Sequence, residues 1–134
     1  MAVWVARTNG ITSLWSSSFR PDLNSWSSAF ELSAGQQVAG DPHYDVAVDS
    51  FGNVLVAWVR TSPVSPYHFY QLQARRLVDS GWQLTVTLDE IQRVTGFEGV
   101  SNARVVLSQA GDGLVVWNRR TSSSVADIMA RVLE

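Results

Sequence analysis

Residues 46–58 read VAVDSFGNVLVAW, and residues 105–117 read VVLSQAGDGLVVW. The two stretches align without a gap at an offset of 59 residues, with glycine and tryptophan at equivalent places in both. A second pair, residues 25–40 and 81–96, aligns at an offset of 56 residues. Two independent matches at nearly the same spacing predict a repeated structural unit of about 54–59 residues.

Two further stretches extend the repeat to both ends of the chain. The opening residues 3–7 resemble residues 57–60, and the closing residues 129–133 resemble residues 73–77. We therefore expect one repeat domain over residues 1–134. Its copies span residues 1–44 (partial), 45–103 (full) and 104–134 (partial).

Hydrophobic residues within one unit recur with a period of two, which is typical of β-strands. In residues 82–88 the pattern predicts that Trp82, Leu84, Val86 and Leu88 point inward. In the equivalent stretch 26–32 it predicts the same of Trp26, Phe30 and Leu32. Residues 54–59 are apolar throughout, as expected of a strand that is covered on both faces. Because no segment has a helical period, the sequence predicts an all-β protein.

The turn signals divide the full unit into four strands and each partial unit into three. The predicted strands are 2–7, 12–17, 26–32, 46–50, 54–60, 69–77, 82–88, 104–108, 114–119 and 127–133. Four-stranded antiparallel units placed side by side are typical of β-propellers. We therefore predict a partial β-propeller of about two and a half blades. Since its edges would be open, we expect self-assembly to complete it; two copies would hold as many strands as five blades.

The composition excludes several classes of function. The chain has no Cys, and all ten of its basic residues are Arg, so thiol and lysine chemistry are absent. A net charge of −2 argues against nucleic-acid binding. No apolar run is long enough to span a membrane, and the N-terminus lacks the layout of a signal peptide. The expected location is unknown and is taken as cytoplasmic by default.

The pattern V-A-V-D-x-x-G-N-x-x-x-x-W at residues 46–58 is followed by a loop, by Ala74-Arg75 and by Gly81-Trp82. This order resembles the blades of bacterial sialidase-like (BNR-type) β-propellers. The resemblance implies a propeller fold with glycan-related or protein-binding roles. The Asp-box of that family, Ser-x-Asp-x-Gly-x-Thr-Trp, is absent, and residues 49–52 match it only roughly.

Residues that recur in the repeat are explained most simply by the core or by ion pairing. The equivalent tryptophans are expected to pack between blades. These are Trp4, Trp58 and Trp117, together with Trp26 and Trp82. Arg7, Arg60 and Arg119 follow the first three of them. The resemblance to sialidases implies that three such arginines could bind a carboxylate, whereas the simpler alternative is that each pairs with a neighbouring acid or caps a strand.

Residues outside the repeat are the better binding candidates. The loop 61–69 is stiffened by two prolines and ends in Tyr67, His68 and Phe69, which suit recognition of a sugar or a protein surface. Segments 41–45, with His43 and Tyr44, and 97–99 occupy matching connections, so they are expected to line the same rim. Trp15 is either an exposed stacking ring or part of an interface.

No catalytic constellation is recognisable. The two histidines have no metal-pair spacing, although Asp41, His43 and Asp45 together could offer an oxygen-rich cation site. We therefore expect a non-enzymatic binding or scaffold module without metal or cofactor. Its expected partner is itself, with a glycan or protein ligand in addition. The alternative is a lectin-like protein or a remnant of a sialidase-like glycoside hydrolase.

Overall fold

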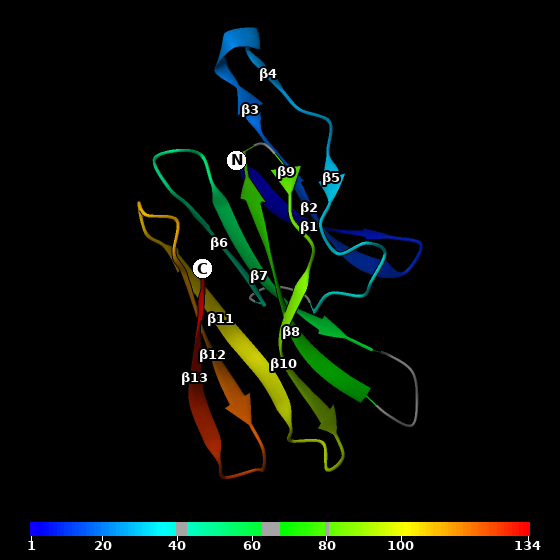
Figure 1. The fold of residues 1–134 in the computed structure, drawn as a ribbon. Coiled ribbons are helices and arrows are strands. Elements are labelled where there is room, and N and C mark those ends of the chain that lie inside the picture. Colours follow the sequence, from blue (N-terminus) through cyan, green and yellow to red (C-terminus); the bar gives the residue numbers. More distant parts are fainter. Residues whose placement is uncertain (40–42, 63–67, 80) are drawn as a thin grey trace.

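A computed structural model describes residues 1–39, 43–62, 68–79 and 81–134. The chain is all-β, and its strands form three main antiparallel sheets (Figure 1). The first sheet has the order β1 (Ala2–Thr8), β2 (Ile11–Ser17), β5 (Phe30–Glu31). The only helical element in the described residues is a 3-10 turn over Pro21–Leu23, and none of those residues forms a helix able to cross a membrane.

The middle and third sheets continue the same up-and-down order. The middle sheet contains β6 (Tyr44–Val48), β7 (Val54–Thr61), β8 (His68–Val78) and β10 (Val86–Arg93), with the short β9 (Gly81–Trp82) pairing with the end of β8. The third sheet contains β11 (Gly99–Leu107), β12 (Gly113–Arg120) and β13 (Ala126–Leu133). In chain order the main sheets thus hold three, five and three strands; the sequence predicts three, four and three, and the additional strand is the two-residue β9.

The hairpins at residues 46–58 and 105–117 have the same local structure. Val46 pairs with Val56 in one, and Val105 pairs with Val115 in the other. In the first turn the Asp49 carboxylate accepts hydrogen bonds from the amides of residues 51 and 53. In the second turn the Ser108 hydroxyl accepts them from the amides of residues 110 and 112. The predicted alignment therefore corresponds to matching register and turn geometry.

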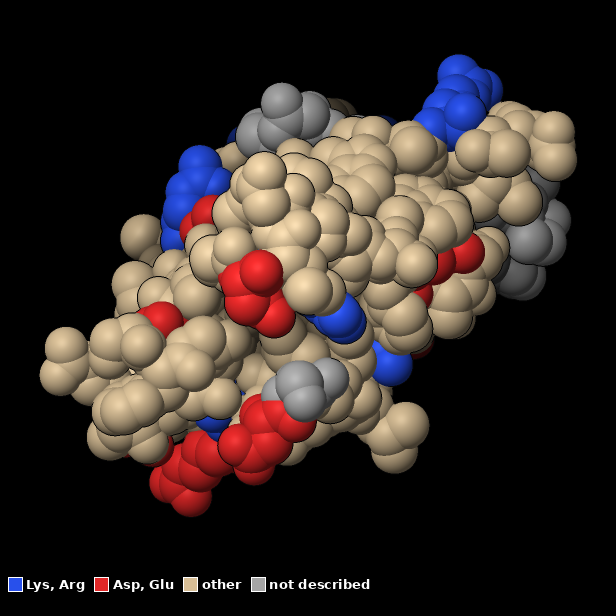
Figure 2. All heavy atoms as spheres, turned by 90° about the horizontal axis from the view of Figure 1, so that it is seen from above, with Lys and Arg blue, Asp and Glu red and all other residues tan. Residues whose placement is uncertain are grey.

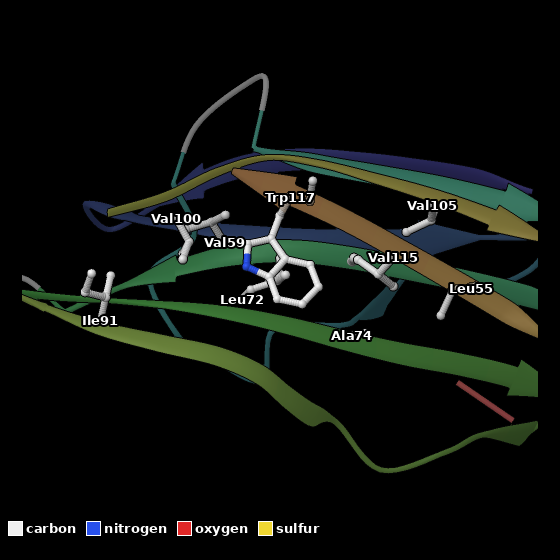
Figure 3. Packing of buried hydrophobic residues seen from close by; sticks show 11 residues of the cluster. Leu55, Val59, Leu72, Ala74, Ile91, Val100, Val105, Val115 and Trp117 are labelled. Atoms are coloured by element: carbon white, nitrogen blue, oxygen red, sulfur yellow. The ribbon is translucent and has the colours of Figure 1, made fainter. Parts of the chain in front are cut away.

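The middle sheet is packed on both of its faces. Residues 54–59 of β7 are all buried, as their continuous apolar character predicts. Leu55, Ala57 and Val59 contact the third sheet, whereas Val54, Val56 and Trp58 contact the first. Figure 3 shows the Trp117 side chain extending from β12 of the third sheet toward Leu72 of β8 in the middle sheet. Successive sheets are thus joined by two apolar layers, with a tryptophan of the later sheet in each.

The inward pattern predicted for residues 82–88 holds for Trp82 and Leu88, which are half-buried against the core, but is wrong for Leu84 and Val86. Leu84 is 87% exposed and Val86 is 44% exposed, and the strand runs over Val86–Arg93 instead. A bulge between Thr87 and Asp89 shifts the register, because an extra residue in one strand reverses which side chains face inward. As a result, Asp89 and Ile91 are the buried residues of β10.

The equivalent prediction for residues 26–32 holds only for Leu32, which is fully buried. Trp26 and Phe30 are 56% and 42% exposed. Trp26 belongs to a small hairpin, β3 (Phe19–Arg20) and β4 (Ser25–Trp26), that projects from the top of the molecule (Figure 1). Its indole packs on Phe19, with ring centroids 5.4 Å apart, so this tryptophan is not a core residue.

Candidate functional site

Several connections gather at one end of the three sheets. They are the β1–β2 turn, the link after β5, the end of β7, the start of β8, the β10–β11 loop, the end of β12 and the start of β13 (Figure 1). We call this end the rim. Two pockets open on it, and Tyr70 of β8 lines both. The rim is therefore the part of the fold where side chains from all three sheets meet.

The larger pocket lies between the first and middle sheets and has a volume of about 780 Å³. Its lining includes the neutral polar residues Asn9, Gln36, Gln37, Thr61 and Ser62. Two of the predicted binding residues, Arg60 and His68, also line it. Gln37 has a structural role, because its Oε1 accepts the Thr12 amide at 3.0 Å.

Arg60 is held at the edge of this pocket by its neighbours. Its Nη1 donates to Gln71 Oε1 at 2.9 Å, and its guanidinium carbon lies 5.2 Å from the centroid of the Phe69 ring. Its Nε is buried without a hydrogen-bond partner among the described residues. Gln71 in turn donates to Glu90, so a polar chain crosses β7, β8 and β10.

The smaller pocket lies between the middle and third sheets and has a volume of about 460 Å³. His43 and residues 97–99 line it together, as the sequence predicts for the two connections that contain them. Arg93 at the end of β10 and Arg120 at the end of β12 add two guanidinium groups. Sequence reasoning missed both arginines and Tyr70. Their position at strand ends beside the predicted rim segments was the signal that could have identified them.

Glu98 is engaged by its own loop. Its carboxylate accepts the Thr95 hydroxyl at 2.7 Å and the amides of residues 94, 95 and 96 at 2.9–3.2 Å. The hydrogen bond from the Thr95 hydroxyl, with those from the amides, outweighs desolvation and lowers the pKa of Glu98 to about 2. The carboxylate is thus ionised, and its oxygens face donors of the loop.

The three repeated arginines do not share a pocket in the described structure. Arg119 forms an ion pair with Asp89, whose other oxygen accepts the indole N–H of Trp117 at 2.7 Å. Arg60 lines the pocket on the other side of the middle sheet, and Arg7 is exposed near the end of β1. The structure therefore gives Arg119 the pairing role that was the simpler alternative.

The predicted aromatic candidates have different environments. His68 is exposed, with Nδ1 3.3 Å from the Ser62 carbonyl, and Phe69 is half-buried beneath Arg60. Tyr44 packs against the core between the first and middle sheets. Trp15 is half-buried, and its Nε1 has no hydrogen-bond partner among the described residues. Tyr67 lies outside the described residues.

The described residues offer no group of three metal-ligating side chains. Asp41, part of the cation site considered from sequence, lies outside the described range. Asp45 is used structurally, because its Oδ2 accepts the Val105 amide at 3.0 Å and so ties β6 to β11. On the side of the molecule that Figure 2 shows, acidic and basic side chains lie in small groups separated by uncharged residues.

The outer face of the third sheet is mostly apolar, although it includes the exposed Arg104, and no sheet of the described residues packs on it. Side chains at alternate positions of its strands point away from the middle sheet, since their neighbours at the intervening positions pack on it. Val106 and Val132 are each 60% exposed on this face, and Ile128 is 79% exposed.

Comparison with known proteins identifies no relative: no family model, no curated protein and no solved structure matches this chain.

Proposed function

We propose that this chain is a non-enzymatic, propeller-like binding module that associates with a second copy of itself. The observation that carries the proposal is the apolar outer face of the third sheet. An exposed patch of this kind usually marks an interaction surface. A glycan or protein ligand would then bind at the rim, which remains accessible when the sheet faces are covered.

The uncovered face corresponds to a face that is covered elsewhere in the same chain. The third sheet packs on Leu55, Ala57, Leu72 and Ala74 of the middle sheet. Residues 59 positions later on β12, and 56 positions later on β13, carry apolar side chains again. They are Leu114, Val116, Ile128 and Ala130. A sheet that packs on the middle sheet would therefore find similar chemistry on the third.

The first sheet supplies the complementary tryptophan. In the sequence alignment Trp4 is equivalent to Trp58 and Trp117, each of which packs in the layer next to the preceding sheet. Val3 and Val5 of β1 pack toward the middle sheet, so Trp4 points to the opposite face, where Trp15 is its cross-strand neighbour. We infer that Trp4 of one copy packs on Ile128 and Ala130 of the other.

This contact is head-to-tail, because it joins two different surfaces of the chain. Head-to-tail contacts generate rings when the rotation closes. Since the strands of one chain form three separate main sheets, two copies would form a ring of six sheets rather than five. Propellers commonly hold about 4–8 blades, so two copies fit and three do not.

Light scattering after size-exclusion chromatography tests the association. At micromolar concentration we expect the mass of two 14.8 kDa chains. Ile128→Asp should shift the protein to one chain, because a carboxylate in the apolar contact would lose its water. Leu84→Asp is the matched control: Leu84 is equally exposed but lies between β9 and β10. A monodisperse single chain for the parent protein would overturn the proposal.

A lectin-like role is the second candidate, and the larger pocket favours it. Amides and hydroxyls line that pocket beside the Tyr70 and His68 rings, a combination that suits the hydroxyls and apolar faces of a neutral sugar. A glycan array, with tryptophan fluorescence titrations of any hit, tests this role. Hydrolysis of a fluorogenic sialoside that Arg60→Ala abolishes would instead support the hydrolase alternative.

A further inference from the structure

We propose that the smaller rim pocket binds a dianionic oxyanion group, such as the phosphate of a phosphate monoester. Its described lining does not include Trp4, Ile128 or Ala130, on which the proposed self-association rests. The inference therefore goes beyond self-association and does not depend on it.

The pocket contains two guanidinium groups that form no ion pair within the described part of the chain. Arg93 donates from Nε and Nη2 to the Gly96 carbonyl, at 2.9 and 2.5 Å, and from Nη1 to the Tyr70 hydroxyl at 3.1 Å. Both acceptors are neutral. These contacts orient the guanidinium, yet leave one N–H on each terminal nitrogen for a ligand, because arginine has five donors.

Arg120 contributes the second guanidinium from the end of β12. It is exposed, and within the described chain it has neither a hydrogen-bond acceptor nor a carboxylate partner. Among the described residues that line the pocket, Glu98 is the only acidic one. Because its oxygens accept four donors of its own loop, Glu98 forms no ion pair with either arginine in the described structure.

Neutral groups around the arginines complete a site for an oxyanion. Asn118, Asn102 and Ser101 line the same pocket and can donate to oxygen. His43 lies at its inner side with a buried Nδ1 that has no partner among the described residues. Guanidinium groups match phosphate and carboxylate oxygens in two-point contacts. The phosphate of a monoester presents three terminal oxygens, enough to contact both guanidinium groups, whereas a carboxylate presents only two.

Titration with inorganic phosphate, followed by NMR of the backbone amides at constant ionic strength, tests the site. We expect saturable shifts confined to the residues in and around the pocket, which are 43, 70, 93–102, 118–120 and 126, with sulfate competing and acetate binding at least 10-fold more weakly. Competition by sulfate would identify the doubly charged oxyanion as the recognised feature, whereas tighter binding of acetate than of phosphate would overturn the assignment to a dianion.

Substitution of the two arginines separates a built site from general attraction. Arg120→Gln and Arg93→Gln should each weaken phosphate binding about 10-fold or more, since a hydrogen bond to a charged group commonly contributes about 1.5–3 kcal/mol. Arg7→Gln removes an equally exposed arginine outside the pocket and should leave binding unchanged. The proposal would be overturned if all three variants weakened phosphate binding equally. It would also be overturned if the amide shifts did not saturate at the highest phosphate concentration, which would indicate an adventitious ion only. Light scattering of each variant shows separately whether self-association persists.

Discussion

Asp89 shows how one polar residue can join two sheets. Its carboxylate binds the Trp117 indole and the Arg119 guanidinium, both from β12, although Asp89 itself belongs to β10. It is 9% exposed, so little water replaces these partners if they are lost. Buried polar groups are costly when unpaired, and this residue therefore supports the contact between the middle and third sheets.

Asp89→Ala should lower the free energy of unfolding by about 2 to 3 kcal/mol, because it leaves a buried indole N–H and a guanidinium without their acceptor. This loss of unfolding free energy is smaller than the loss expected for a fully buried ion pair, because the Arg119 side chain is 33% exposed. Urea denaturation followed by tryptophan fluorescence measures the change. Asp112→Ala, at an exposed turn, is the control and should change stability by less than about 0.5 kcal/mol. Equal effects would contradict the bridging role.

Glu98 makes the stability of the rim loop sensitive to acid. Its pKa is about 2 in the folded chain and has an ordinary value of 4.5. A depressed folded pKa contributes stability that is complete above the unfolded value and is lost as the pH falls through the folded one. The parent protein should thus melt at a higher temperature than Glu98→Gln at pH 7. This difference in melting temperature should shrink between about pH 5 and pH 2 and vanish at lower pH.

Carboxyl NMR titration checks the cause directly. Thr95→Val removes the hydroxyl donor and should raise the pKa of Glu98 from about 2 toward its ordinary value. A melting-temperature difference that is independent of pH would show that the loop does not use the charge. The sequence predicts a connection here, but the effect of the loop on Glu98 was not predictable, because most of the donors are backbone amides whose direction depends on the folded turn.

Among the elements, β7 was the most predictable and β10 the least. A continuous apolar run has one interpretation in an all-β chain, and residues 54–59 are indeed buried on both faces. The alternation at residues 82–88 misled because the strand begins four residues later, with a bulge that a period-two pattern does not reveal. The β3–β4 hairpin was missed for a related reason: two-residue strands carry no period.

The rim was predictable in its position but not in its chemistry. Matching connections placed His43 and residues 97–99 at one end of the sheets, and they do line one pocket. The roles of Arg93, Arg120 and Tyr70 depend on which side chains face each other across the gap between two sheets. That information lies in tertiary packing, which neither a repeat nor a spacing contains.

The start of β12 packs tightly on β7 and offers a test of their contact. A Cβ added at Gly113 would lie 2.6 Å from Leu55 Cδ2, inside the apolar layer. Gly113→Ala should therefore destabilise the protein by about 1 to 3 kcal/mol, the usual cost of overpacking a core. Gly81→Ala is the matched control in β9, where the nearest atom would lie at 3.7 Å. Thermal unfolding measures both variants. An equal loss of stability in Gly113→Ala and Gly81→Ala would exclude close packing at Gly113.

At the scale of the whole molecule, the open question is how the outer faces of the first and third sheets are covered. Two arrangements could bury the apolar face of the third sheet. In one, third sheets of two copies meet face to face; in the other, the third sheet of one copy meets the first sheet of the next. Only the second also covers Trp4 and can close a ring through two identical contacts.

The absence of cysteine from the chain allows these arrangements to be separated by cross-linking. Ala6 shares the outer face of the first sheet with Trp4, and Ala130 lies on the outer face of the third sheet. With a short bis-maleimide, a mixture of Ala6→Cys and Ala130→Cys proteins should give a two-chain product containing one of each. Ala130→Cys alone should give little. Efficient cross-linking of Ala130→Cys with itself would instead support the face-to-face arrangement, in which no ring forms.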